Sequence, residues 1–106
     1  MILREIAHAR SGDKGDVANI SVIAFDAGQY GFLLEYVTAE RVAAHFGDLV
    51  RGEVVRYELP RIAALNFVLT KALGGGVLRS LSLDTHGKSL SSALLSMELP
   101  EDSGKE

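Results

Sequence analysis

The sequence contains no cysteine, no long apolar run and no excess of basic residues. Without cysteine the chain cannot form disulfide bonds, thiolate zinc sites, iron–sulfur clusters or a cysteine nucleophile. No apolar run approaches the roughly 20 residues that a membrane-spanning helix needs, and the start of the chain, with Arg4 and Glu5, does not resemble a signal peptide. We therefore expect a cytoplasmic protein with no membrane partner, and the lack of cysteine suits a reducing compartment.

The formal net charge of the 106-residue chain is −3, and this excess lies at the C-terminal end. Residues 98–106 carry four acids and one lysine, which also sum to −3, so the rest of the chain is neutral as a whole. Because no basic stripe is available for a phosphate backbone, we expect no nucleic-acid partner. The length predicts one domain over residues 1–100, followed by a disordered acidic tail over residues 101–106.

Hydrophobic periodicity divides the chain into strands and helices. Alternating or β-branched apolar residues predict strands over residues 2–9, 17–25, 54–59 and 78–83. Apolar residues at helical spacing predict helices over residues 30–37, 38–47, 60–73 and 90–97, with Pro60 starting the third of these and Gly74-Gly75-Gly76 ending it.

This order of elements predicts an α/β (α+β) domain in which helices pack against a four-stranded mixed sheet. The overall order is β-β-α-β-α-β-α, where residues 30–47 count as one helical region. A short hairpin would join the first two strands in antiparallel fashion. The two β-α-β units that follow would be right-handed crossovers between parallel strands.

The densest group of polar residues lies in the predicted loop between the first two strands. Its glycines would let the backbone adopt positive φ and point amide groups inward, which makes an anion-binding nest. Basic and hydroxyl side chains would add donors for a phosphate or carboxylate. We therefore predict ligand binding by Arg10, Ser11, Gly12, Lys14, Gly15 and Asn19.

The same loop also carries two carboxylates, which favour a different chemistry. Asp13 and Asp16 could hold a hard divalent cation such as Mg²⁺ together with water and a substrate phosphate. His8 could then serve as a general acid or base, since its reference pKa is about 6.5. The alternative to a functional site is a solvated hairpin loop in which the aspartates cap turns and pair with Lys14.

Two further positions are secondary candidates. Residues 84–89, Asp84-Thr85-His86-Gly87-Lys88-Ser89, follow a predicted strand and open a helix, so Lys88 could hold an anion there. The phosphate-loop pattern of nucleotide triphosphatases is absent, because Ser82 stands where that pattern needs glycine. Asn66 falls on the apolar stripe of the predicted helix over residues 60–73, where a buried amide needs a partner. We assign no functional role to His45.

Four segments of the sequence resemble a known family. They are HARSGDKGDVANI (8–20), TAERVAAHFG (38–47), RYELPRIAALNFVLTKALGGG (56–76) and SLSLDTHGKSLSSALL (80–95). Together they are similar to the C-terminal domain of the acyclic terpene utilisation protein AtuA and its relatives. The resemblance implies a ferredoxin-like two-layer sandwich and a place in isoprenoid or acyl-CoA catabolism. It also implies a separately encoded AtuA-like large subunit, because this domain usually follows a much larger one in the same chain.

Three hypotheses about function follow. The chain could be an accessory domain or subunit that binds an anionic group, such as a CoA ester, phosphate or carboxylate, at the loop of residues 10–16. It could instead be a small metal-dependent enzyme that uses Asp13, Asp16 and His8. It could also be a structural module that oligomerises, most simply as a homodimer, because a sheet with a poorly covered face or a bare edge tends to self-associate.

Overall fold

The computed structural model describes residues 1–14, 17–71 and 90–100. Their centre is a four-stranded sheet formed by β1 (Ala7–Lys14), β2 (Val17–Ala24), β3 (Val54–Leu59) and β4 (Ala64–Leu69). The strand order is β1-β2-β4-β3 and every pairing is antiparallel. The predicted hairpin between the first two strands is confirmed, whereas the predicted mixed sheet is wrong for the described strands, which are all paired antiparallel. β2 and β3 run parallel, as the first predicted crossover requires, but β4 lies between them.

The fourth strand of this sheet is β4, in the segment predicted to be a helix over residues 60–73. Here Leu65, Phe67 and Leu69 are buried, while Asn66 and Val68 are partly exposed. This period of two is the pattern of a strand that is covered on one face. A short 3-10 helix (Pro60–Ile62) and Ala63, which has a φ of 53°, reverse the chain between β3 and β4. The predicted strand over residues 78–83 lies outside the described residues.

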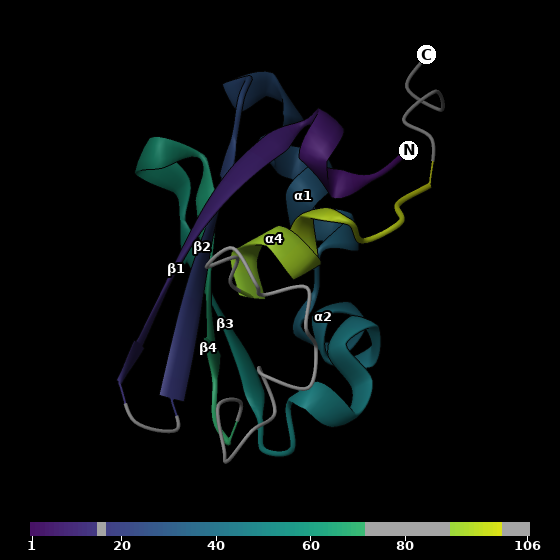
Figure 1. Cartoon of the computed structure of the whole chain (residues 1–106). Coiled ribbons are helices and arrows are strands. Elements are labelled where there is room, and N and C mark those ends of the chain that lie inside the picture. The colour runs from purple at the N-terminus through teal and green to yellow at the C-terminus, as the bar shows by residue number, and fades with distance from the viewer. Residues whose placement is uncertain (15–16, 72–89, 101–106) are drawn as a thin grey trace.

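Helices cover one face of the sheet (Figure 1). They are α1 (Tyr30–Tyr36), α2 (Ala39–Phe46) and α4 (Leu90–Leu95), and each coincides with a predicted helix. The Thr38 side chain caps α2 by accepting a hydrogen bond from the Arg41 amide. The core between the layers is formed by fully buried side chains of both, among them Ile20, Phe67, Leu33, Val42 and Leu94. The described residues therefore form a two-layer α+β sandwich, consistent with a ferredoxin-like fold.

The first residues of the chain are not part of this sheet, contrary to the strand predicted over residues 2–9. Leu3–Glu5 form a 3-10 helix, and β1 begins only at Ala7. The segment pairs instead with the chain after α4, because the Leu3 amide donates to the Met97 carbonyl at 2.9 Å and the Leu99 amide donates to the Met1 carbonyl at 2.8 Å. Leu3 is thereby fully buried.

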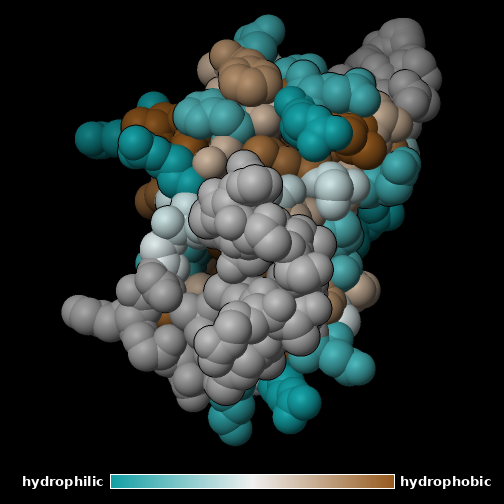
Figure 2. All heavy atoms as spheres, viewed as in Figure 1, coloured by the Kyte–Doolittle hydropathy of each residue, from teal (hydrophilic) through white to brown (hydrophobic). Residues whose placement is uncertain are grey.

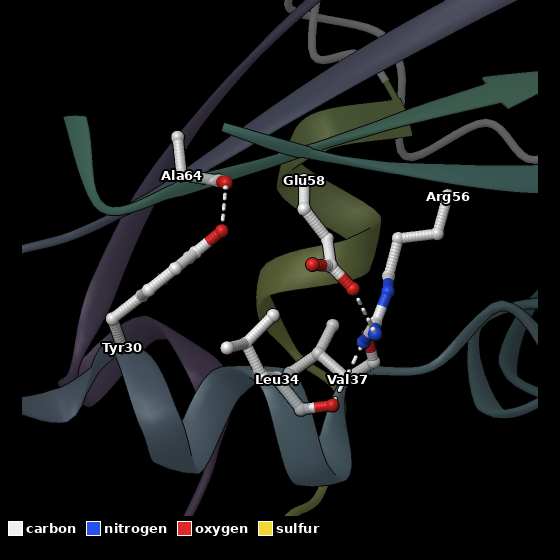
Figure 3. Close-up of polar contacts among 6 residues, drawn as sticks. All are labelled: Tyr30, Leu34, Val37, Arg56, Glu58 and Ala64. Atoms are coloured by element: carbon white, nitrogen blue, oxygen red, sulfur yellow. Dashed lines mark hydrogen bonds and ion pairs between the residues drawn. The ribbon is translucent and has the colours of Figure 1, made fainter. Parts of the chain in front are cut away.

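Polar contacts fasten α1 to the sheet (Figure 3). The Arg56 guanidinium donates to the carbonyls of Leu34 at 2.8 Å and Val37 at 2.9 Å, which lie at the C-terminal end of the helix. Arg56 also pairs with Glu58 at 3.1 Å. The Tyr30 hydroxyl donates to the Ala64 carbonyl at 2.9 Å. β3 and β4 thus hold both ends of the helix.

None of the helices within the described ranges has both the length and the apolar character that crossing a bilayer requires.

Candidate functional site

The second face of the sheet carries no helix from the described part of the chain, and we call it the open face (Figure 1). Side chains alternate between the two faces along each strand, so every second residue of a strand lies on the open face. The strand register aligns these residues in rows across the sheet. The first row is His8, Ile23, Ala64 and Leu59; the second is Arg10, Ser21, Asn66 and Tyr57; the third is Gly12, Asn19, Val68 and Val55. Predicted site residues from β1, β2 and β4 therefore share one surface.

The second row is polar from β1 to β3. The Asn66 side chain donates its Nδ2 hydrogen to the Ser21 hydroxyl at 2.9 Å. Because the Ser21 oxygen accepts this bond, its own hydrogen remains available for a ligand. Arg10 lies directly opposite Ser21 in the β1–β2 register, is exposed, and forms no hydrogen bond or ion pair with another described residue.

Among the open-face side chains that the structure describes, the charge is of one sign: Arg10 is a cation, and none of them is a carboxylate. Asn19 lies in the third row, one strand over and one row along from Arg10, within reach of the same ligand. An anion placed over this corner would therefore meet a guanidinium and neutral amide and hydroxyl groups, without a competing acid.

The end of the open face beyond the first row is apolar. Phe25 follows β2, is 62% exposed, and stacks on His8 with ring centroids 5.5 Å apart. Ile62, in the β3–β4 connection, is 59% exposed, and Figure 2 shows hydrophobic residues gathered where this connection lies, at the upper left of the view. The other large exposed apolar side chains in the described ranges are on open-face strand positions; they are Val17, Val55, Tyr57 and Leu59. Within the described part of the chain, the large exposed apolar side chains are thus concentrated on and beside the open face.

The predicted loop of residues 10–16 is mostly strand. β1 continues to Lys14, so Arg10 and Gly12 belong to the open face while Ser11 belongs to the opposite, helix-facing side. Gly12 does not have the positive φ that an amide nest needs; among the described glycines only Gly47 does. The nest predicted for Gly12 is therefore wrong, and Gly15 and Asp16 lie outside the described residues.

The predicted metal-dependent arrangement does not gather its residues. His8 and Asp13 are five positions apart on the extended strand β1, which separates their Cα atoms by about 16 Å. Among the described residues no three histidine, aspartate or glutamate side chains could share a metal ion. His8 instead contacts Phe25 at the apolar end of the open face. A role for Asp13 with Asp16 stays a prediction.

The secondary candidates have different outcomes. Asn66 lies on a strand rather than a helix, and its predicted need for a partner is met by Ser21. Lys88, Asp84, Gly87 and Gly74-Gly75-Gly76 lie outside the described residues. His45, given no role, links α2 to α4: its Nε2 lies 2.8 Å from the Ala93 carbonyl oxygen, and because that oxygen only accepts, the ring donates.

Sequence reasoning missed three open-face residues, Ser21, Phe25 and Tyr57. Ser21 interrupts an apolar run between Ile20 and Val22, which is the signal of a strand with one face uncovered. Tyr57 could be placed beside Asn66 only through the β3–β4 register. That register requires residues 64–69 to be a strand, so the helix prediction concealed it.

Comparison with known proteins gives a match to one protein family. The model of the AtuA ferredoxin-like domain family matches residues 1–100 of the chain. No curated protein and no solved structure shows significant similarity to it.

Proposed function

The chain belongs to the AtuA ferredoxin-like domain family, and from this premise we propose that it is an accessory binding domain whose ligand is an anionic group held on the open face at Arg10. The observation that supports this most directly is the exposed Arg10 guanidinium, which faces Ser21 and has no ionic partner among the described residues. A guanidinium presents paired N–H donors that match the oxygens of a carboxylate or phosphate.

The neighbouring groups suit this ligand. Ser21 can donate its hydroxyl hydrogen because Asn66 supplies the bond that its oxygen accepts, and Asn19 offers a further amide from the adjacent row. Gly12 leaves space for a ligand beside these groups, since it carries no side chain. Such a set suits binding, orientation and charge neutralisation of a ligand, and this supports the proposal of a binding role.

The biological setting we propose is an AtuA-type isoprenoid or acyl-CoA catabolic system. The anionic group would be the phosphate or carboxylate portion of a CoA ester or related acid. A separately encoded AtuA-like large subunit would supply the chemistry. Among the described residues no cluster favours an independent metal-dependent reaction.

Calorimetric titration with pyrophosphate, acetyl-CoA and a short-chain carboxylate tests the site. We expect binding by the wild-type chain and a loss of at least about 10-fold in affinity for Arg10→Gln, the typical worth of charge-assisted hydrogen bonds. Arg4→Gln is the matched control, because it removes the same charge from an exposed residue of the N-terminal 3-10 helix. If no anion binds, or if both variants lose affinity equally, the proposal is wrong.

The partner is tested by repeating the titration in the presence of the purified large subunit. A tighter wild-type complex that Arg10→Gln weakens would support a shared ligand site. If the two proteins do not associate with or without the acyl-CoA, the accessory role is contradicted, whatever the isolated chain binds.

A further inference from the structure

The two halves of the open face are complementary to each other. The strand order β1-β2-β4-β3 means that a half-turn about an axis along the strands, between β2 and β4, sets β1 of one copy over β3 of another. The same turn sets β2 over β4 and leaves each row facing itself. Two copies related in this way would stack their open faces as a sandwich of aligned sheets.

Side-chain sizes match under this rotation. Gly12 of one copy faces Val55 of the other, and Ile23 faces Ala64, so a small residue meets a larger one in each case. Ser21 faces Asn66, which pairs polar with polar. At the apolar end, Phe25 comes over the β3–β4 connection that carries Ile62.

Charge selects this rotation over the alternative. With the axis along the strands, the cation Arg10 faces the exposed ring of Tyr57 in the second copy, a favourable cation–π pairing. With the axis across the strands at the second row, β1 would lie over β1 and Arg10 would face Arg10. Since the described open face has no carboxylate to offset two guanidinium groups, that arrangement is disfavoured.

The available area is sufficient for a weak dimer. Four strands spaced about 4.8 Å apart, with six to eight residues each, give a face of roughly 500 Å² per copy. The total of about 1,000 Å² is at the lower limit of specific interfaces. A flat, fully exposed anion site on one copy alone would be open to water and salt, so a second copy would also give Arg10 the enclosed environment that ligand sites have.

We propose that two copies of this chain pack their open faces in this orientation and that Tyr57 of the second copy completes the anion site at Arg10. This rests on the proposed function of that site. β1 and β3 are the edge strands of the sheet that the described residues form, so each dimer has two equivalent sites at opposite edges of the sandwich, where a ligand can enter. The Tyr57 hydroxyl donates to the anion that the Arg10 guanidinium holds.

The absence of native cysteine makes the orientation testable by cross-linking. Gly12→Cys and Val55→Cys proteins are mixed and treated with a short bis-maleimide at concentrations where sedimentation detects dimer. A side chain at Gly12 is tolerated, because a Cβ there would come no closer than 3.8 Å to Asn19. We expect a covalent dimer from the mixture and little from either protein alone. A chain that is monomeric up to millimolar concentration, or cross-linking as strong with Gly12→Cys alone, overturns the proposal.

Ligand completion is tested with Tyr57→Phe, which keeps the ring and removes the hydroxyl. We expect an unchanged dimer and a fall of about five-fold in pyrophosphate affinity, the worth of one hydrogen bond. Tyr36→Phe, in the helical layer, is the control and should change neither. If pyrophosphate binds through Arg10 to a monomer, the second copy is ruled out while the proposed function stands. If the dimer forms but no anion binds, the proposed function is wrong and the completed site falls with it.

Discussion

At the scale of single residues, Arg56 and Arg10 show two different uses of one side chain. Arg56 points to the helical layer, where only 18% of its side chain is exposed and it donates to two carbonyls at the end of α1. Arg10 lies on the open face and donates to no described residue. Both are arginines on edge strands, so neither composition nor spacing separates them. Strand register and the position of α1 decide which is structural.

The contacts of Arg56 with α1 predict that this side chain stabilises the fold. Arg56→Met keeps the apolar stem but leaves the Leu34 and Val37 carbonyls without their donor, so we expect a loss of about 2 kcal/mol in the free energy of unfolding. Urea denaturation measures it. Glu58→Gln is the control: it removes only the ion pair to a Glu58 side chain that is 55% exposed, which is worth about 1 kcal/mol at most. Equal losses in the two variants would mean that the carbonyl contacts contribute little.

At the scale of elements, the sequence predicted α1, α2, α4, β2 and β3 closely and misassigned β4. Residues 60–73 satisfy both periods: Ile62, Leu65 and Leu69 have helical spacing, while Leu65, Phe67 and Leu69 alternate. Local propensity does not resolve this ambiguity, because antiparallel pairing with β2 and β3 stabilises the strand and is non-local. The sequence therefore singled out Arg10 and Gly12 of β1 and Asn19 of β2 as candidates, but it missed Ser21. It also did not show that these residues share a surface, because that needed the β4 register.

The central position of β4 predicts its hydrogen-exchange behaviour. β2 and β4 each have a strand on both sides, whereas β1 and β3 each have one neighbour among the described strands. We expect the amide hydrogens of β2 and β4 to exchange most slowly among the described strands, since they open only with global unfolding. Exchange measured by mass spectrometry or nuclear magnetic resonance would check this. Fast exchange over residues 64–69 would contradict a central strand.

Two glycines at the sheet have opposite requirements. A Cβ on Gly52 would collide with the Thr70 side chain and lie 2.6 Å from the Thr70 carbonyl oxygen, to which the Gly52 amide donates. We therefore expect Gly52→Ala to lower the free energy of unfolding by about 1–3 kcal/mol. Gly12→Ala is the control and should change it by less than about 0.5 kcal/mol, because the nearest atom to its Cβ lies at 3.8 Å. Thermal denaturation of both variants distinguishes them, and a neutral Gly52→Ala would show that the Thr70 segment can shift.

At the scale of the whole molecule, the apolar residues divide into those that hold the fold together and those that do not. The core is closed where the first residues of the chain meet the segment after α4, and Leu3 is fully buried there. The large exposed apolar side chains of residues 1–14, 17–71 and 90–100 instead lie on and beside the open face. Scattered exposed residues need no explanation, but a contiguous set on one surface indicates an interaction site.

A pair of truncations separates these two roles. Leu3→Ala should cost about 2–5 kcal/mol of unfolding free energy, because it leaves a cavity in the core. Ile62→Ala, at a site that is 59% exposed, should change that free energy by less than about 1 kcal/mol when measured on the dilute, monomeric chain.

At higher concentration the wild-type melting temperature should rise with self-association, since a partner that binds only the folded state stabilises it by mass action. Ile62→Ala should reduce this increase of the melting temperature with concentration, whereas Leu3→Ala should lower the melting temperature equally at every concentration. A concentration-independent melting temperature for the wild type would contradict self-association through the open face.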